Sequence, residues 1–147
     1  MKIYIGSDHA GYELKEKLKI FIKELGYEIE DKGAFSLEIN DDYPDFIVPT
    51  AEAVSEDSGA LGIILGGSGQ GEAICANKIK GVRASVYYGY TPEIVKVTRE
   101  HNNANILSLG ARFINEEEAK EAVKIFIETK FSEDERHIRR IKKLEKN

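Results

Sequence analysis

Residues 60–72, with the sequence ALGIILGGSGQGE, place an apolar run, a glycine-rich loop and a helical segment directly after one another. The apolar run at 60–65 predicts a short buried strand, and residues 72–79 predict a helix. The loop between them favours an anion-binding cradle, because the first amides of a helix are unpaired and point toward the preceding loop. A tight turn without a ligand is the alternative interpretation, since glycine loops after strands are common.

The loop also carries a hydroxyl group on Ser68 and a carboxylate on Glu72. A carboxylate in the first helical turn is by itself explained by the helix dipole. A loop that only bound phosphate would not require this negative charge, however. The combination therefore predicts chemistry on a substrate that develops negative charge, with Glu72 transferring a proton.

Strands and helices are expected to alternate along the whole chain. Apolar patterning predicts strands at residues 3–6, 27–31, 60–65, 82–88 and 105–110, and helices at 12–25, 44–54, 72–79, 91–101, 116–130 and 132–145. Pro49 is expected to kink or restart its helix. These elements predict a single α/β domain over residues 1–147, a three-layer α/β/α sandwich of the Rossmann or flavodoxin-like kind. Its sheet is expected to be parallel and five-stranded, with the order 2-1-3-4-5, and to be followed by an extended C-terminal helix.

The expected strand order also predicts where a ligand would bind. In open parallel sheets, ligands bind beyond the carboxyl ends of the strands, at the point where the strand order reverses. The reversal here lies between the first and third strands, which end in Ser7-Asp8-His9 and in the glycine loop. Asp8 and His9 are therefore expected beside the loop. A helix N-cap and a surface imidazole are the alternative interpretation of these two residues.

The composition argues against several classes of protein. A net charge of −5 argues against general nucleic-acid binding, and no apolar run approaches the roughly 20 residues needed to span a bilayer. The single cysteine, Cys75, is expected to be a small core residue. A chain with one cysteine fits a reducing compartment, and the cytoplasm is the expected location. Three dispersed histidines give no metal-ligand spacing with this cysteine.

The charged C-terminal segment contains Arg136 and Arg140, which are four residues apart and share one helix face. The pair could bind one phosphate together, or it could belong to a solvated basic face. His137, in the same helix, is expected to be solvated. His101 ends the helix before the fifth strand, where the helix dipole favours a cation without any function. This position lies at the amino edge of the sheet, so a second subunit must bring His101 to the cradle if it acts there. The last helix is likewise expected to extend over a neighbour.

Five stretches carry a resemblance to known proteins: GSDHAG (6–11), DYPD (42–45), GIILGGSGQGEAICANKIKGVRA (62–84), HNNANILSLGAR (101–112) and ERHIRRI (135–141). With them the sequence resembles the ribose-5-phosphate isomerase B family, also called the RpiB/LacAB sugar-phosphate isomerases. The resemblance implies a cofactor-free and metal-free α/β/α enzyme that forms a homodimer or a tetramer, with active sites shared between subunits.

The resemblance further implies interconversion of ribose 5-phosphate and ribulose 5-phosphate, in the non-oxidative pentose phosphate pathway. A six-carbon aldose phosphate, such as allose 6-phosphate or galactose 6-phosphate, is the alternative substrate. A non-catalytic domain of the same fold that binds phosphate or a nucleotide is the alternative from a different class of function.

One position departs from the family pattern. Many members carry a cysteine base at the start of the glycine loop, where this chain has Gly66. The sequence instead resembles the subgroup, familiar from mycobacterial enzymes, in which a glutamate later in the loop is the base. The resemblance thus assigns proton transfer to Glu72. Cys75 does not align with the family cysteine, which agrees with its expected place in the core.

The resemblance also assigns roles to the other candidates. Glu72 would move a proton between carbon 2 and carbon 1 through an enediolate, and Ser68 would relay a proton or bind a substrate oxygen. His101 of the partner subunit would assist ring opening. The remaining residues would bind the substrate: Gly67, Ser68, Gly69, Gln70 and Gly71 its oxyanion, Asp8 and Asn102 its hydroxyls, and His9, Arg112, Arg136 and Arg140 its phosphate. Structural packing after the fifth strand is the alternative for Arg112.

Overall fold

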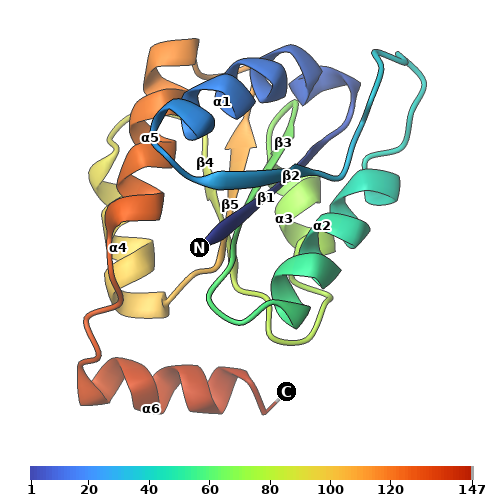
Figure 1. Ribbon diagram of the computed structural model, residues 1–147. Coiled ribbons are helices and arrows are strands. Elements are labelled where there is room, and N and C mark those ends of the chain that lie inside the picture. The colour runs from blue at the N-terminus through green and yellow to red at the C-terminus, as the bar shows by residue number, and fades with distance from the viewer. Residues whose placement is uncertain (147) are drawn as a thin grey trace.

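The chain folds into a five-stranded parallel sheet with helices on both faces (Figure 1). A computed structural model describes residues 1–146, so Asn147, the last residue of the expected domain, lies outside the described residues. The strands are β1 (Lys2–Ser7), β2 (Glu28–Asp31), β3 (Leu61–Gly66), β4 (Ala84–Tyr87) and β5 (Ile106–Gly110). The helices are α1 (Tyr12–Glu24), α2 (Pro44–Glu56), α3 (Gln70–Ala76), α4 (Glu93–Asn102), α5 (Glu116–Glu128) and α6 (Glu135–Leu144), with a short 3-10 turn η1 (His9–Gly11) before α1.

The strand order is β2-β1-β3-β5-β4, so the predicted order 2-1-3-4-5 is wrong at its last two positions. β5 pairs with β3, with Gly66 opposite Gly110, and β4 pairs only with β5 at the edge of the sheet. The physical reason is burial. Every residue of β5 is buried, as an interior parallel strand requires, whereas three of the four residues of β4 are only half-buried. The reversal between β1 and β3 is as predicted.

Apolar side chains form two cores, one between each face of the sheet and the helices that cover that face. Leu18 of α1, Val95 of α4 and Phe126 of α5 belong to the core on one face, and Ile47 of α2 and Ala76 of α3 belong to the core on the other. The side chains of a strand alternate between the two faces of a sheet, so β3 contributes to both cores. This three-layer arrangement leaves the ends of the strands open for a binding site.

Several element boundaries differ from the sequence-based prediction. α2 is continuous across Pro49, so the expected restart there is wrong, because a proline this near the first turn removes few helix hydrogen bonds. α3 begins at Gln70, two residues earlier than predicted, and its first turn therefore includes Glu72. Cys75 packs, partly buried, against the core between α2, α3 and the sheet, which confirms its expected place.

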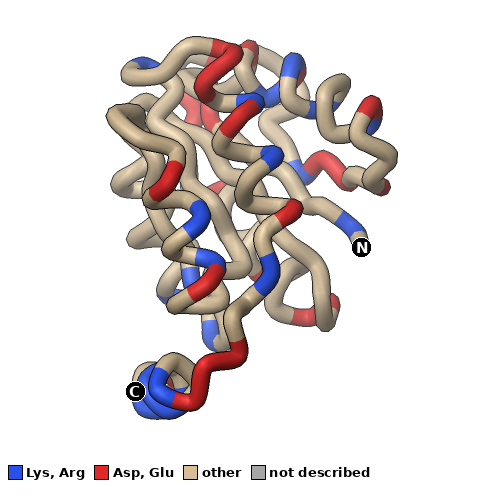
Figure 2. Tube along the Cα trace, turned by 90° about the vertical axis from the view of Figure 1, so that its left-hand side faces the viewer, with Lys and Arg blue, Asp and Glu red and all other residues tan. Residues whose placement is uncertain are grey.

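α6 lies apart from the three layers, across the end of the molecule that holds the amino ends of the strands (Figure 1). Its basic residues gather there as a cluster, seen end-on in Figure 2: Arg136, Arg139, Arg140, Lys142 and Lys143. Among the described residues, no helix is both long enough and apolar enough to cross a membrane.

Candidate active site

The glycine loop is held in place through its carbonyl groups by β5 and the residues after it. The amide of Ala111 donates to the Gly66 carbonyl (2.8 Å), and the amide of Arg112 donates to the Gly67 carbonyl (3.1 Å). The Ser108 hydroxyl donates to the Gly69 carbonyl (2.6 Å). Gly69 has a φ of +75°, a left-handed conformation that favours glycine. These hydrogen bonds to the loop carbonyls require β5 to lie directly beside β3. The observed strand order therefore fixes the position of the glycine loop.

Glu72 places its carboxylate beside the first glycine of this loop. Its exposure is only 4%, and a Cβ atom placed on Gly66 would overlap the carboxylate, lying 2.5 Å from Oε2. Burial raises the pKa of Glu72 above its ordinary value of 4.5, and the negative charge of Asp8 raises this pKa further. A buried carboxylate with a raised pKa beside a backbone cradle has the properties of a proton-transferring base.

Asp8 and His9 follow β1 at the same edge of the sheet, as predicted. Asp8 is buried and is the N-cap of η1, with Oδ1 accepting from the amides of Ala10 (2.9 Å) and Gly11 (3.3 Å). The N-cap interpretation of Asp8 is therefore confirmed. The ring of His9 is oriented by a residue that the sequence did not suggest, because its Nδ1 lies 2.7 Å from Oδ1 of Asp41.

Two further side chains border the glycine loop. A Cβ atom on Gly67 would lie 3.0 Å from Nη1 of Arg112, and one on Gly71 would lie 3.0 Å from the hydroxyl oxygen of Tyr43. The structure thus brings Arg112 to the loop. Tyr43 is not among the predicted site residues, although it lies in the DYPD stretch at 42–45 that carries part of the resemblance.

His101 lies at the opposite end of the sheet, where its ring stacks on that of His137. The two ring centroids are 4.3 Å apart and the planes are inclined by 17°. His137 is only 5% exposed, so the expectation that it is solvated is wrong. The reason is that the chain before α6 turns back to α4, with the Ser132 amide donating to the Glu100 carbonyl (3.2 Å). Burial, followed by the neighbouring His101, lowers the pKa of His137 below its ordinary value.

The other predicted residues at this amino edge are exposed. Arg136 and Arg140 lie on the outer part of α6, and Arg136 Nε pairs with Oδ2 of Asp134 at 3.3 Å.

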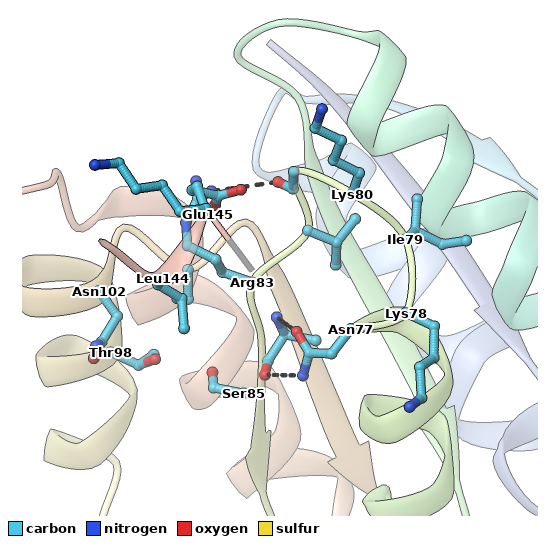
Figure 3. A pocket seen from close by; sticks show the side chains of 15 residues that line it. Asn77, Lys78, Ile79, Lys80, Arg83, Ser85, Thr98, Asn102, Leu144 and Glu145 are labelled. Carbon is cyan, nitrogen blue, oxygen red and sulfur yellow. Dashed lines mark hydrogen bonds and ion pairs between the residues drawn. The ribbon is translucent and has the colours of Figure 1, made fainter. Parts of the chain in front are cut away.

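Asn102 lines a cavity of about 820 Å³ between α4, the start of β4 and the end of α6 (Figure 3). An ion pair between Arg83 and Glu145 (2.6 Å) ties the chain just after α6 to this cavity. The glycine loop does not contribute to its lining.

The predicted site residues therefore form two separate groups within one chain. Glu72, Asp8, His9 and Arg112 lie with the glycine loop at the carboxyl edge of the sheet, whereas His101, Asn102, Arg136 and Arg140 lie at the amino edge. The five residues of β5 alone span roughly 16 Å between the edges. One small sugar phosphate cannot contact both groups in the same subunit.

The carboxyl-edge group places a buried carboxylate beside a glycine-rich loop in an α/β fold. Residues 3–144 match the family model described as Ribose/Galactose Isomerase, and the chain belongs to that family. Ribose-5-phosphate isomerase B of Mycobacterium leprae is 44% identical over 141 residues, which cover 96% of this chain and 86% of the relative.

Solved structures of related proteins share the whole fold. The ribose-5-phosphate isomerase B of Mycoplasma genitalium, solved with bound ribulose-5-phosphate, is 36% identical with a TM-score of 0.93, and the match covers 99% of this chain and 94% of that one. The isomerase of Thermotoga maritima is 41% identical with a TM-score of 0.92, covering 99% and 98% of the two chains.

Proposed function

We propose that this chain is an aldose–ketose isomerase that interconverts ribose 5-phosphate and ribulose 5-phosphate through an enediolate, as a step of pentose phosphate metabolism. Family membership and the name of the Mycobacterium leprae relative support this activity. The bound ribulose-5-phosphate in the Mycoplasma genitalium structure supports the substrate class. The observation that carries the proposal is the buried carboxylate of Glu72 beside the glycine loop.

Glu72 is the base of the proposed reaction. It removes the proton from carbon 2 of the open-chain aldose and returns it to carbon 1, so the reaction needs a group that is ionised before the step and protonated during it. The overlap between a Cβ atom at position 66 and the Glu72 carboxylate supports this assignment, because the carboxylate occupies the space of a residue-66 side chain. A glutamate base thus takes the place where the resemblance expects cysteine in many other members.

The glycine loop stabilises the oxyanion of the enediolate in this proposal. Its carbonyls at Gly66, Gly67 and Gly69 are already bonded to β5 and the following residues, so the loop is rigid before substrate arrives. Preorganised donors of this kind contribute about 3–4 kcal/mol each to transition-state binding where they have been tested. Ser68 accepts from the Gln70 amide (3.2 Å), which leaves its hydroxyl hydrogen for a substrate oxygen.

The complete site is proposed to form between two subunits. His9 and Arg112 from one chain, together with Arg136 and Arg140 of the partner subunit, bind the phosphate. His101 of the partner subunit assists ring opening, and Asn102 of the partner subunit binds a sugar hydroxyl. The separation of the two groups along β5 supports this arrangement. So does α6, which carries the arginine pair on its exposed outer part and is expected to pack on the neighbour.

The activity is tested by incubating the protein with ribose 5-phosphate in heavy water. Enediolate chemistry predicts both ribulose 5-phosphate and incorporation of solvent deuterium, whereas a domain that only binds phosphate or a nucleotide gives neither. Turnover on allose 6-phosphate and galactose 6-phosphate, measured in parallel, decides between five- and six-carbon substrates. A higher kcat/KM for a six-carbon phosphate would contradict the proposed substrate.

A further inference from the structure

We propose that Asp41 is a positioning residue for His9, which holds the imidazole ring so that its Nε2 faces the phosphate of the substrate. The proposal rests on the proposed function, because it takes His9 as a phosphate-binding group. Asp41 precedes α2, at the end of the segment between β2 and that helix, and belongs to none of the predicted site stretches.

Asp41 contacts both the backbone and the ring of His9. Its Oδ1 accepts from the His9 amide at 3.1 Å and lies 2.7 Å from the ring Nδ1. An ionised carboxylate only accepts hydrogen bonds, so Nδ1 must carry a hydrogen atom. Nε2, on the far side of the ring, is then left for the substrate. A single oxygen atom thus fixes the position, the ring orientation and the Nδ1 proton of His9.

The fold places Asp41 independently of any ligand. The segment that carries Asp41 is held at its start by Lys15, whose Nζ donates to the Ala34 carbonyl (2.6 Å), and by Asp31, which accepts from the Gly33 amide (2.9 Å). Near its end, the Asp41 amide donates to the Glu38 carbonyl (3.1 Å). His9 is therefore oriented before substrate binds, and substrate binding need not order its ring.

The side-chain contacts of Asp41 are made with His9. The Asp41 side chain is 9% exposed, and its Oδ2 is buried with no hydrogen-bond partner among residues 1–146. Asp8 Oδ2 lies 3.9 Å from the same ring nitrogen.

The same three side chains could instead hold a cation. Ligand atoms of Asp8, His9 and Asp41 lie within 4.8 Å of one another. A metal ion bound by Nδ1 of His9 would need a lone pair on that nitrogen, however, and a hydrogen bond from Nδ1 to an ionised Asp41 leaves none. We therefore treat the cluster as a hydrogen-bonded positioning device, and the test includes the metal as an outcome.

The test compares the kinetics of Asp41→Ala and Asp41→Asn with those of wild type and of Glu38→Ala, an exposed control on the same segment. Loss of a charge-assisted hydrogen bond that orients a binding group predicts a roughly tenfold rise in KM for Asp41→Ala, with kcat changed less than about twofold. The inhibition constant of inorganic phosphate should rise in parallel. Asp41→Asn keeps an acceptor oxygen for the amide and the ring of His9. The KM of Asp41→Asn should therefore lie between that of wild type and that of Asp41→Ala.

A double-mutant cycle separates positioning from a general structural role. In a His9→Ala background, Asp41→Ala should cause no further rise in KM, because the ring that it orients is gone. An equal rise in both backgrounds would overturn the proposal, as would a fall in kcat at unchanged KM. Loss of wild-type activity on chelation, restored by a divalent cation, would also overturn it. Failure of the wild-type protein to isomerise any sugar phosphate would instead remove the proposed function.

Discussion

The space that a side chain at Gly66 would occupy is filled by the carboxylate of Glu72. Gly66 ends β3, and Glu72 lies in the first turn of α3, so the glycine loop brings together two residues six positions apart. A side chain can therefore occupy this space from either position, but not from both. The observed position of the Glu72 carboxylate thus requires a residue without a Cβ atom at position 66.

The first prediction concerns this exclusion. Gly66→Ala should lower the free energy of unfolding by about 1–3 kcal/mol, the usual cost of overpacking, because Glu72 must move. In a Glu72→Ala background the same substitution should cost much less, since the overlapping atoms are gone. Denaturant unfolding of the four proteins measures the difference. Equal costs in both backgrounds would show that the two side chains do not compete for one space.

The second prediction follows from the raised pKa of Glu72, caused first by burial and then by Asp8. The base must be ionised to remove a proton, so kcat/KM should fall as the pH falls through this pKa, and the midpoint should lie above 4.5. A pH–rate profile measures it. An acid limb at or below 4.5 would contradict the assignment.

The stability of Glu72→Gln gives an independent check of the same pKa. A carboxyl whose pKa is raised in the folded state binds more protons in the folded state than in the unfolded state. Its contribution to stability is therefore present at low pH and is lost as the pH rises through the pKa of the folded state. Glu72→Gln should therefore be more stable than wild type at neutral pH. The difference should shrink as the pH is lowered toward 4.5.

The third prediction concerns Lys15, a fully buried lysine whose Nζ lies 2.8 Å from both carboxylate oxygens of Asp31. Lys15→Met should lower the free energy of unfolding by about 3–5 kcal/mol, because it leaves Asp31 without its most buried partner. Lys17→Met is the matched control on the same helix. Lys17 is 54% exposed and pairs with Glu116, so its loss should cost less than about 1 kcal/mol.

The effect of Lys15→Met should depend on pH in a defined direction. Burial alone would raise the pKa of Asp31, but hydrogen bonds from Lys15, Lys19 and the Gly33 amide lower it below 3.8. A depressed pKa contributes stability above the unfolded-state pKa, and this stability is lost as the pH falls through the folded-state pKa. The stability difference between wild type and Lys15→Met should therefore narrow at acidic pH. A constant difference would argue against the ion pair as its cause.

The fourth prediction tests the shared site. Glu72→Gln and His101→Asn proteins should each be nearly inactive alone. After subunit exchange, a mixed dimer has one site with both wild-type residues, so an equal mixture should recover about a quarter of the wild-type activity. Mass spectrometry of differently tagged chains verifies the exchange. Verified exchange without recovery would place both residues in the same subunit's site.

Much of the fold could be predicted from periodicity, but the order of the last two strands could not. Both β4 and β5 follow a helix, and either order is compatible with parallel pairing. In the structure, the two strands differ in burial. Ile106–Gly110 is buried throughout, whereas Ala84–Tyr87 is mostly half-buried, and an interior strand must be covered on both faces.

For the candidate site too, some positions of single residues could be predicted from the sequence and others could not. Glu72 and Asp8 are adjacent because they follow strands on either side of the reversal, which the topology predicts. Asp41 reaches His9 across 32 residues, and no local pattern indicates that contact. The expectation that His137 is solvated rests on its charged neighbours in the sequence. His137 nevertheless shares a helix face with Ile141 and Leu144, at spacings typical of a packed surface.

The central claim is that Glu72 is the base that moves the proton in this isomerase. The most direct test is the kcat of Glu72→Gln for ribose 5-phosphate, because glutamine keeps the size of the side chain and removes its basicity. The account predicts a loss of at least about a hundredfold in kcat, with substrate binding largely retained. Turnover near the wild-type rate by a correctly folded Glu72→Gln protein would contradict it.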